Sequence, residues 1–364
     1  MDRRQVLGAG VAAGVMMGGV PAWAQAQDAG PAWVKLPTEP YRGKQDDVVF
    51  VDAMTGWYGN GAGKLFKTTD GGQTWVKQMD KPGTFVRALG FVDAGLGFLG
   101  NIGPDYFPGV TDATPLYRTR DGGTSWEAVT IDGPPMTGIC AIDVHKASFI
   151  NAGVLDHRVT IRAGGRVGGP AQLATSRDGG ETWTSEDLSA LTAMILDVHF
   201  VDERIGFICG ASDTEVTQSR AVILRTGDGG RSWSRVHEGT RPFELTWKMS
   251  FPSETTGYVT IQSYNPDPTV SQRVFAKTTD GGLTWREMPL IDSAPVRQFG
   301  IGFVDESRGW IGAVPNGFET RDGGTTWTPA AMGLAVNKMR IVPNGAGHAV
   351  FGIGTELHRL DLPG

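Results

Sequence analysis

The chain repeats one eight-residue phrase six times, and this repetition constrains its fold more than any other feature. The phrase first appears as TTDGGQTW at residues 68–75. It returns as TRDGGTSW, SRDGGETW, TGDGGRSW, TTDGGLTW and TRDGGTTW, starting at 119, 176, 226, 278 and 320. Asp-Gly-Gly predicts a tight turn, because the carboxylate can accept backbone N–H bonds and glycine adopts positive φ at little steric cost. We call these segments the Asp-Gly-Gly turns.

The residues on either side of each turn predict two strands and a buried tryptophan. A β-rich run such as AVILRTGD (221–228) precedes the turn, and a short run such as SWSRV (232–236) follows it. A catalytic or calcium-binding residue has no reason to be copied six times, so we interpret the aspartates as turn residues and the tryptophans as packing residues. The residues concerned are Asp70, Asp121, Asp178, Asp228, Asp280 and Asp322, with Trp75, Trp126, Trp183, Trp233, Trp285 and Trp327.

A second phrase precedes each turn and completes a four-stranded unit. It reads DVVFVDAMTGWYGNG (47–61), ALGFVDAGLGFLGN (88–101), DVHFVDERIGFICG (197–210) and GIGFVDESRGWIGA (300–313), with diverged copies AIDVHKASFINAG (141–153) and KMSFPSETTGYVT (248–260). Each copy predicts strand, polar turn and strand, which we name A and B; strands C and D flank the Asp-Gly-Gly turn. Four-stranded units at intervals of 42 to 57 residues are typical of β-propeller blades.

The two ends of the chain predict a seventh blade. Residues 337–363 supply strands A, B and C but stop before a strand D, whereas PAWVKLP (31–37) imitates the segment that follows each Asp-Gly-Gly turn. We therefore expect an all-β, seven-bladed propeller over residues 31–363, whose last blade is closed by the N-terminal strand. Such closure removes an exposed sheet edge.

Composition narrows the function classes. The 53 glycines and 21 prolines fit short strands and turns, and the formal charge of −6 argues against nucleic-acid binding. The six histidines lack metal-ligand spacing and no phosphate-binding loop is present, so we expect neither metal nor cofactor. Cys140 and Cys209 lie in strand-like runs, where either buried free thiols or a disulfide would fit.

The first 26 residues resemble a twin-arginine export signal. Arg3 and Arg4 precede an apolar run at 6–20, and PAWAQAQ offers small residues for cleavage, which would leave a mature chain starting near Gln25 or Gln27. We expect a periplasmic monomer with no membrane span once this segment is removed, because an apolar run of 15 residues is too short to cross a bilayer comfortably.

The repeated S/T-x-D-G-G-x-T/S-W phrase resembles the Asp-box, or BNR, repeat of sialidases, xyloglucanase-type glycosidases and sortilin-like receptors. The fuller unit, FVD…GW/GF…G followed by L…T.DGG.TW, is most similar to the photosystem II assembly factor family of plants and cyanobacteria, over about residues 31–363. This resemblance implies a non-catalytic protein that binds or helps to assemble a membrane or envelope protein. The arginine patch described for that family has no residue-by-residue counterpart here.

Propeller geometry predicts where a binding site would lie. The A–B and Asp-Gly-Gly turns share one face, the turn face, whereas the B–C and D–A loops form the opposite loop face around the channel mouth. We expect long B–C loops at 101–115, 153–172, 210–220 and 262–273. Their candidate binding residues are Asp105, Tyr106, Phe107, Asp156, His157, Arg158, Arg162, Arg166, Arg220, Tyr264, Asn265 and Asp267, joined by Arg241, Glu244, Trp247 and Arg297 from the D–A loops and the strands that they enter.

A glycan-active or glycan-binding protein is the alternative. Glycoside hydrolysis needs two carboxylates facing one another across a sugar, for which Asp105, Asp156 and Asp267 are candidates on the expected loop face. The chain lacks the Arg-Ile-Pro phrase of sialidases and any Gly-x-Ser-x-Gly motif, so we expect no catalytic residue.

Overall fold

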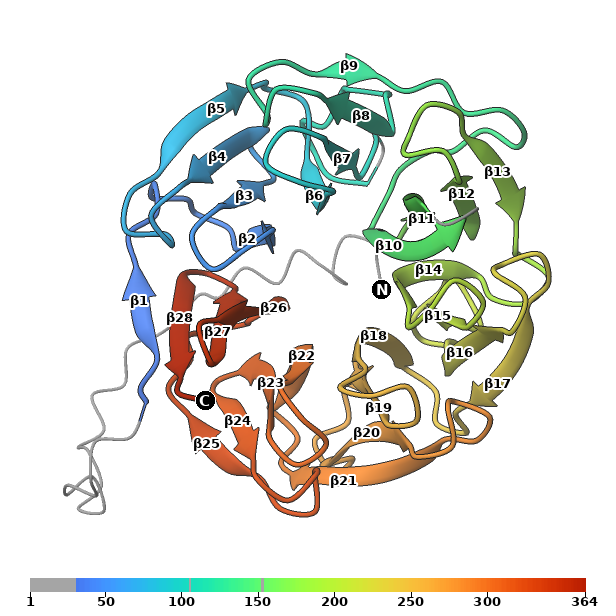
Figure 1. Ribbon diagram of the computed structural model, residues 1–364. Helices are drawn as coiled ribbons and strands as arrows, with labels where there is room; N and C mark the ends of the chain where they lie inside the picture. The colour runs from blue at the N-terminus through green and yellow to red at the C-terminus, as the bar shows by residue number, and fades with distance from the viewer. Residues whose placement is uncertain (1–30, 105, 152–153) are drawn as a thin grey trace.

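A computed structural model of the protein describes residues 31–104, 106–151 and 154–364, and the predicted signal segment and Asp105 therefore lie outside the described residues. The described residues form seven four-stranded antiparallel sheets, arranged as blades around a central axis (Figure 1). This confirms the predicted all-β, seven-bladed propeller. None of these residues forms a helix of the length and apolarity that a bilayer crossing requires.

The first four blades follow the chain in order. Blade 1 contains β2 (Gln45–Phe50), β3 (Gly56–Asn60), β4 (Lys64–Thr68) and β5 (Val76–Asp80); blade 2 contains β6 (Val86–Phe91), β7 (Gly97–Asn101), β8 (Leu116–Thr119) and β9 (Glu127–Ala128); blade 3 contains β10 (Ala141–Asn151), β11 (Val154–Gly165), β12 (Gln172–Ser176) and β13 (Thr184–Asp187); blade 4 contains β14 (Met194–Phe200), β15 (Gly206–Ala211), β16 (Ala221–Thr226) and β17 (Ser234–Glu238).

The remaining blades complete the ring. Blade 5 contains β18 (Glu244–Ser250), β19 (Gly257–Ser263), β20 (Gln272–Thr278) and β21 (Arg286–Asp292); blade 6 contains β22 (Arg297–Phe303), β23 (Gly309–Val314), β24 (Gly317–Thr320) and β25 (Thr328–Ala330); blade 7 contains β26 (Lys338–Asn344), β27 (Gly347–Ile353), β28 (Leu357–Leu362) and β1 (Val34–Leu36).

Blade 7 joins the two ends of the described chain. Strand β1 pairs antiparallel with β28, with Val34 opposite Arg359 and Leu36 opposite Leu357. Trp33 then takes the place of a turn tryptophan and meets Trp310 of blade 6 edge to face, with ring centroids 5.8 Å apart. The N-terminal strand is therefore the outermost strand of the last blade (Figure 1).

The Asp-Gly-Gly turns have the hydrogen bonds that their sequence predicts. In the first turn, Asp70 Oδ1 accepts the backbone N–H of Thr74 at 2.9 Å, and the Thr68 hydroxyl donates to the same carboxylate at 2.7 Å. The Thr68 hydroxyl also accepts the N–H of Gly72, whose φ is +91°. The other five turns repeat these contacts. Each aspartate thus closes its own C–D turn.

The FVD…G spacing of the second phrase reflects packing of one ring over one glycine. In blade 4 a Cβ on Gly206 would lie 2.4 Å from the ring of Phe200, so only glycine fits opposite that phenylalanine. Blades 1, 2, 5 and 6 repeat the arrangement. The phenylalanine also meets an aromatic residue of the preceding blade: Tyr258 and Phe303 stack with centroids 3.6 Å apart across the seam of blades 5 and 6.

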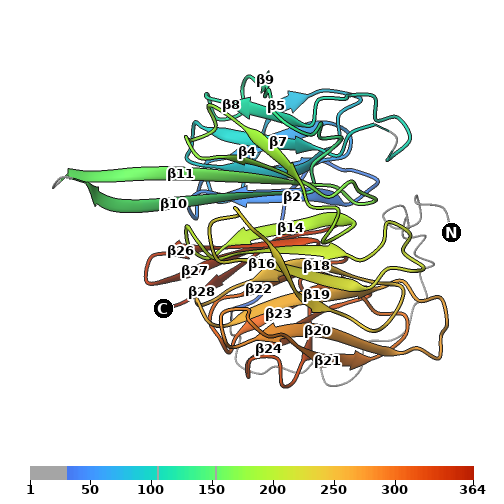
Figure 2. The same cartoon turned by 90° about the vertical axis from the view of Figure 1, so that its right-hand side faces the viewer.

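Blade 3 departs from the prediction. The segment AIDVHKASFINAG was expected to turn in its middle, and residues 153–172 were expected to form a B–C loop; both expectations are wrong, because 141–151 is one continuous strand paired with Val154–Gly165. In blade 1 the turn is capped by Asp52, which accepts the N–H groups of Met54 and Thr55. Blade 3 has Ser148 at the equivalent place and Lys146 in place of the phenylalanine, and its strand A continues into a long hairpin (Figure 2).

Both cysteines are buried inside the propeller, Cys140 just before β10 and Cys209 on β15, and both are free thiols. Cys140 Sγ accepts the N–H of Val167 at 3.3 Å. The disulfide alternative is therefore wrong, and both residues act as small packing groups.

Candidate binding site on the loop face

Four of the candidates that were expected in B–C loops lie on the β10–β11 hairpin instead, namely Asp156, His157, Arg158 and Arg162. Asp156, His157 and Arg158 lie on the outer half of the β10–β11 hairpin, where Arg158 forms an ion pair of 3.2 Å with Glu203 of the blade 4 A–B turn. This places them on the turn face, opposite the channel mouth where they were expected.

Arg162 is a seam residue rather than a surface residue. It is fully buried on β11, its guanidinium lies 3.2 Å from the ring centroid of Phe200, and it reaches the carbonyl of Gly229 at 3.4 Å. Burial lowers its pKa to about 10, an effect that Asp143 opposes. The residue therefore links blades 3 and 4.

The loop face carries an aromatic and cationic cluster at the channel mouth. The Lys44 ammonium lies 5.8 Å from the ring centroid of Trp247 and 5.1 Å from that of Phe299. The Arg297 guanidinium lies 5.3 Å from Tyr264 and 5.8 Å from Phe299. We call Lys44, Trp247, Tyr264, Arg297 and Phe299 the mouth cluster. The sequence singled out three of these residues and missed Lys44 and Phe299.

Lys44 forms no ion pair with a carboxylate of the described residues. Its ammonium donates to Asn337 Oδ1 at 3.3 Å, and the same oxygen accepts the indole N–H of Trp247 at 3.0 Å. Burial lowers the pKa of Lys44 to about 7; Asp46 opposes this shift, and the neighbouring cations Arg87 and Arg297 reinforce it. An anionic group placed here would restore the charged form of the lysine.

Arg87 lies beneath the cluster and is already paired. It is buried on β6, lies 5.4 Å from the ring centroid of Trp247 and donates to Asp46 at 2.5 Å. Its charge is therefore largely offset, which leaves Lys44 and Arg297 as the cations of the mouth without a recorded ion pair in the described chain.

The blade 2 loop borders the mouth. Tyr106 is buried, with a hydroxyl that has no recorded partner, and Phe107 stacks on Phe85 with centroids 4.8 Å apart. Arg166 holds this loop by donating to the carbonyls of Ile102 and Pro104 at 3.1 and 2.9 Å. Arg166 is therefore a positioning residue of the loop face.

A pocket of about 560 Å³ opens beside the cluster, between the loops of blades 1 and 2. Its lining includes Tyr41, Lys44, Asp46, Phe85 and Phe107, so one wall is aromatic and another is charged. Pockets that receive ligands or anchoring side chains commonly combine apolar walls with a few fixed polar groups. The pocket extends the mouth cluster toward the rim.

The other candidates make local contacts. Asp267 accepts the N–H and hydroxyl of Thr269 within its own loop, and Asn265 Oδ1 accepts the N–H of Asp267. Arg241 forms ion pairs with Glu244 and Glu287 at 2.8 and 2.9 Å. Arg220 forms a looser contact of 3.5 Å with Glu238. These contacts stabilise loops and the seam of blades 4 and 5.

Two non-glycine residues with positive φ lie in D–A loops of the loop face. Phe243 has φ of +65° and its carbonyl accepts the N–H of Tyr264; Ala335 has φ of +52° and donates its N–H to Ala313. Backbone strain of this kind is often held at binding sites. Here it fixes the position of Tyr264 beside the mouth.

Charged residues form a ring lower in the channel. The position aligned with Asp47, the first residue of the blade 1 phrase, is occupied by these residues in blades 1 to 7: Asp47, Ala88, Asp143, Asp197, Lys248, Gly300 and Lys338. Asp47 is completely buried, contacts Lys338 of blade 7 and accepts the N–H of Leu89 of blade 2 at 2.6 Å. Asp197 similarly meets Lys248 of blade 5 at 3.3 Å. We call these seven positions the channel ring.

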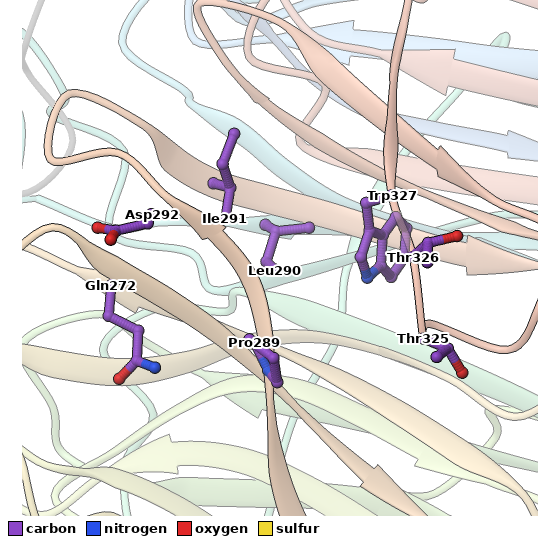
Figure 3. Close-up of a pocket in the computed structure, with 8 residues that line it drawn as sticks. All are labelled: Gln272, Pro289, Leu290, Ile291, Asp292, Thr325, Thr326 and Trp327. Carbon is purple, nitrogen blue, oxygen red and sulfur yellow. The ribbon is translucent and has the colours of Figure 1, made fainter.

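A smaller pocket on the perimeter is a seam groove. Its volume is about 290 Å³, and Figure 3 shows it between Leu290 and Ile291 of β21 and Trp327 of the next blade. A similar groove of about 340 Å³ lies between residues 37–39 and Trp75, at the seam of blades 7 and 1. Because the feature occurs at two seams where a strand D meets a following turn tryptophan, we assign it to blade packing.

No group of three His, Cys, Asp or Glu side chains suited to a metal ion occurs within residues 31–104, 106–151 and 154–364. Of the carboxylates considered for glycoside hydrolysis, Asp267 lies on the loop face and Asp156 on the turn face, so these two cannot face one another across a sugar.

The chain is similar in sequence and in fold to proteins that are already known. No family model matches the chain. The photosystem II assembly lipoprotein Ycf48 of Synechococcus sp. (strain CC9902) is 27% identical over 180 residues, which are 47% of this chain and 47% of that protein. The chain resembles Ycf48. The match spans about half of the length of that curated relative.

Solved structures extend the Ycf48 resemblance to the whole propeller. Ycf48 bound to a D1 peptide superposes with a TM-score of 0.60 at 17% identity, over 94% of this chain and 99% of that one. A GH74 xyloglucanase from Xanthomonas campestris superposes with a TM-score of 0.61 at 15% identity, over 90% of this chain but only 53% of the enzyme. At these identities the structural matches establish the propeller fold alone.

Proposed function

We propose that the protein is a non-catalytic, exported propeller that binds a segment of an envelope or membrane protein at its loop face and assists the assembly of that partner. The observation that carries this proposal is the mouth cluster, in which Lys44 and Arg297 face aromatic rings without a recorded carboxylate contact. The similar Ycf48 is named as an assembly protein and has been solved with a D1 peptide bound.

The chemistry of the mouth favours an extended polypeptide that carries a carboxylate. Cations held over aromatic rings gain strength where water is displaced, and Tyr, Trp and Arg often dominate protein interfaces. The adjoining pocket beside Phe85 and Phe107 can take one apolar side chain of the same segment. A carboxylate near Lys44 would also relieve the unfavourable burial of its charge.

The test is an affinity capture of membrane-derived partners by the mature protein, using detergent-solubilised envelope from its own cell. We expect one membrane protein to be captured by the wild type and lost in the variant Lys44→Gln/Arg297→Gln. Arg321→Gln is the matched control, because it removes an exposed arginine of the blade 6 Asp-Gly-Gly turn on the opposite face. Equal capture by both variants would contradict a site at the mouth. Fractionation of the native cell tests the periplasmic location.

A glycan-active or glycan-binding protein is the second candidate, favoured by the superposition on the GH74 xyloglucanase. A panel of plant and bacterial polysaccharides separates the two functions. Cleavage or binding that survives Lys44→Gln/Arg297→Gln would replace the assembly proposal. We expect neither, since the described carboxylates Asp156 and Asp267 lie on opposite faces.

A further inference from the structure

The β10–β11 hairpin extends beyond every other feature of the turn face (Figure 2). Strand A ends at Phe50, Phe91, Phe200 and Phe303 in blades 1, 2, 4 and 6. The equivalent position in blade 3 is Lys146, yet β10 continues five residues further, to Asn151. At about 3.4 Å per residue, this extension adds roughly 17 Å to the strand.

The described end of this hairpin is apolar. Ile150 and Leu155 are opposite one another across the two strands and are 77% and 61% exposed. Phe149 lies on the next rung and is partly covered by the Arg158 guanidinium, 5.1 Å from its ring centroid. Two large apolar residues held side by side in water favour an apolar environment at this end.

Positive groups follow behind the apolar rung. Arg158 is three residues from Leu155 along β11, and Lys146 lies one rung further toward the propeller, four residues from Ile150 along β10. These distances are about 10 to 14 Å along the strands. Asp156 is the carboxylate of this segment, and it accepts the N–H of His157 at 2.8 Å. The ion pair between Arg158 and Glu203 is solvent-exposed, so it offers little resistance to exchange for another anion.

We propose that the outer half of the β10–β11 hairpin docks on an anionic lipid surface, with Ile150 and Leu155 entering the acyl boundary and Lys146 and Arg158 meeting the headgroups. The order of apolar rung first and cations about 10 Å behind matches the depth of a membrane interface. A specific protein interface buries far more surface than two side chains offer, whereas a lipid surface requires no complementary shape. The loop face would then point away from the membrane.

The experiment is co-sedimentation of the protein lacking residues 1–26 with vesicles. One set is an equimolar mixture of phosphatidylglycerol and phosphatidylcholine, and the other is phosphatidylcholine alone. We expect Ile150→Ser/Leu155→Ser to weaken binding to the anionic vesicles about tenfold or more, and Lys146→Gln/Arg158→Gln to weaken it at least about fivefold, with strong salt sensitivity in the wild type.

Leu283→Ser is the matched control. Leu283 is a leucine of nearly identical exposure, 60%, in the Asp-Gly-Gly turn of blade 5 on the same face, but it is not on the hairpin. Because all the changed side chains are exposed, the variants should unfold at the wild-type urea midpoint. Absence of wild-type binding to the anionic vesicles, or an equal loss in Leu283→Ser, would overturn the proposal. Binding only to a purified envelope protein would replace the lipid surface with a protein partner and would leave the loop-face proposal intact.

Discussion

The Asp-Gly-Gly turns and the channel ring are both repeated features, yet they are repeated in different ways. Each turn has the same aspartate, the same hydroxyl and the same glycine contacts, all within one blade. The channel ring keeps its register but changes its residue, from Asp47 in blade 1 to Lys248 in blade 5 and Lys338 in blade 7. Identical copies therefore close individual blades, whereas different residues at one register connect blades to one another.

The two features therefore differ in how much their loss should lower the stability of the fold. A turn aspartate is exposed and can exchange its hydrogen bonds with water at modest cost. The pair Asp47–Lys338 is buried at the junction of blades 7 and 1, where the propeller closes. Removing Lys338 leaves the buried carboxylate of Asp47 with a single cationic partner, Arg340, at 3.3 Å, and weakened compensation of a buried charge is costly in a low-dielectric interior. The closing seam is thus more sensitive to single substitutions than any one turn.

The largest predicted effect comes from breaking that pair. Lys338→Met leaves the buried carboxylate of Asp47 with only the partly exposed Arg340 as a cation and should lower the free energy of unfolding by up to about 3–5 kcal/mol. Urea unfolding followed by tryptophan fluorescence measures it. The double variant Asp47→Asn/Lys338→Met should recover part of the loss, because the uncompensated charge is gone. A single-variant loss below about 1 kcal/mol would contradict a closing role for the pair.

A smaller effect should follow from overpacking the phenylalanine–glycine contact that repeats within five blades. Gly206→Ala places a methyl group 2.4 Å from the ring of Phe200, and overpacking of this kind costs about 1–3 kcal/mol. Phe200→Leu in the same chain should recover stability if the clash is the cause. Gly179→Ala is a contrasting control: no atom lies within 4 Å of its added Cβ, so only the positive φ opposes it. Failure of Phe200→Leu to recover stability would contradict the clash as the cause, because Gly206, unlike Gly179, does not have positive φ.

The propeller could be predicted from the sequence because most blades repeat the same turn and packing residues. The turn aspartates, the FVD phenylalanine and the glycine opposite it are read from spacing alone, and the structure shows why each is needed. Blade 3 was misread because it differs from the other copies at two positions at once: Lys146 replaces the phenylalanine and Ser148 replaces a turn-capping aspartate such as Asp52. The aspartate alone is not the signal, because blade 5 has Ser253 at the same place and still turns between Ser250 and Gly257.

The candidate site was predicted only in part, because it depends on contacts between blades. Tyr264, Trp247 and Arg297 were recognised, but Lys44 reaches the mouth from a D–A loop, and no local pattern marks it. Arg162 was assigned to a loop because residues 153–172 were interpreted as a B–C loop, whereas it lies on β11 and packs against Phe200 of blade 4. The channel ring was also missed, although Asp47, Asp197 and Lys248 begin aligned phrases.

A single buried hydroxyl in a turn should matter less than the seam. Thr278→Val removes the donor to Asp280 and the acceptor of the Gly282 N–H, and should cost about 1–2 kcal/mol. Thr226→Val makes the equivalent change in blade 4. Because the two turns have the same contacts, their losses should agree within about 0.5 kcal/mol and should add in the double variant. Clearly unequal losses would show that the copies are not equivalent.

The smallest effect concerns one exposed turn carboxylate and depends on pH. Hydrogen bonds from Thr326 and Thr320 hold the pKa of Asp322 at about 2, below its unfolded value near 4. A depressed pKa contributes stability that is present above the unfolded pKa and is lost as the pH falls from about 4 through 2. Asp322→Asn should therefore lower the urea midpoint slightly at pH 6, and the difference from wild type should vanish near pH 2. If the lower urea midpoint of Asp322→Asn persists undiminished at pH 2, the charge of the carboxylate does not stabilise the turn. The turns would then differ from the channel ring in something other than electrostatics.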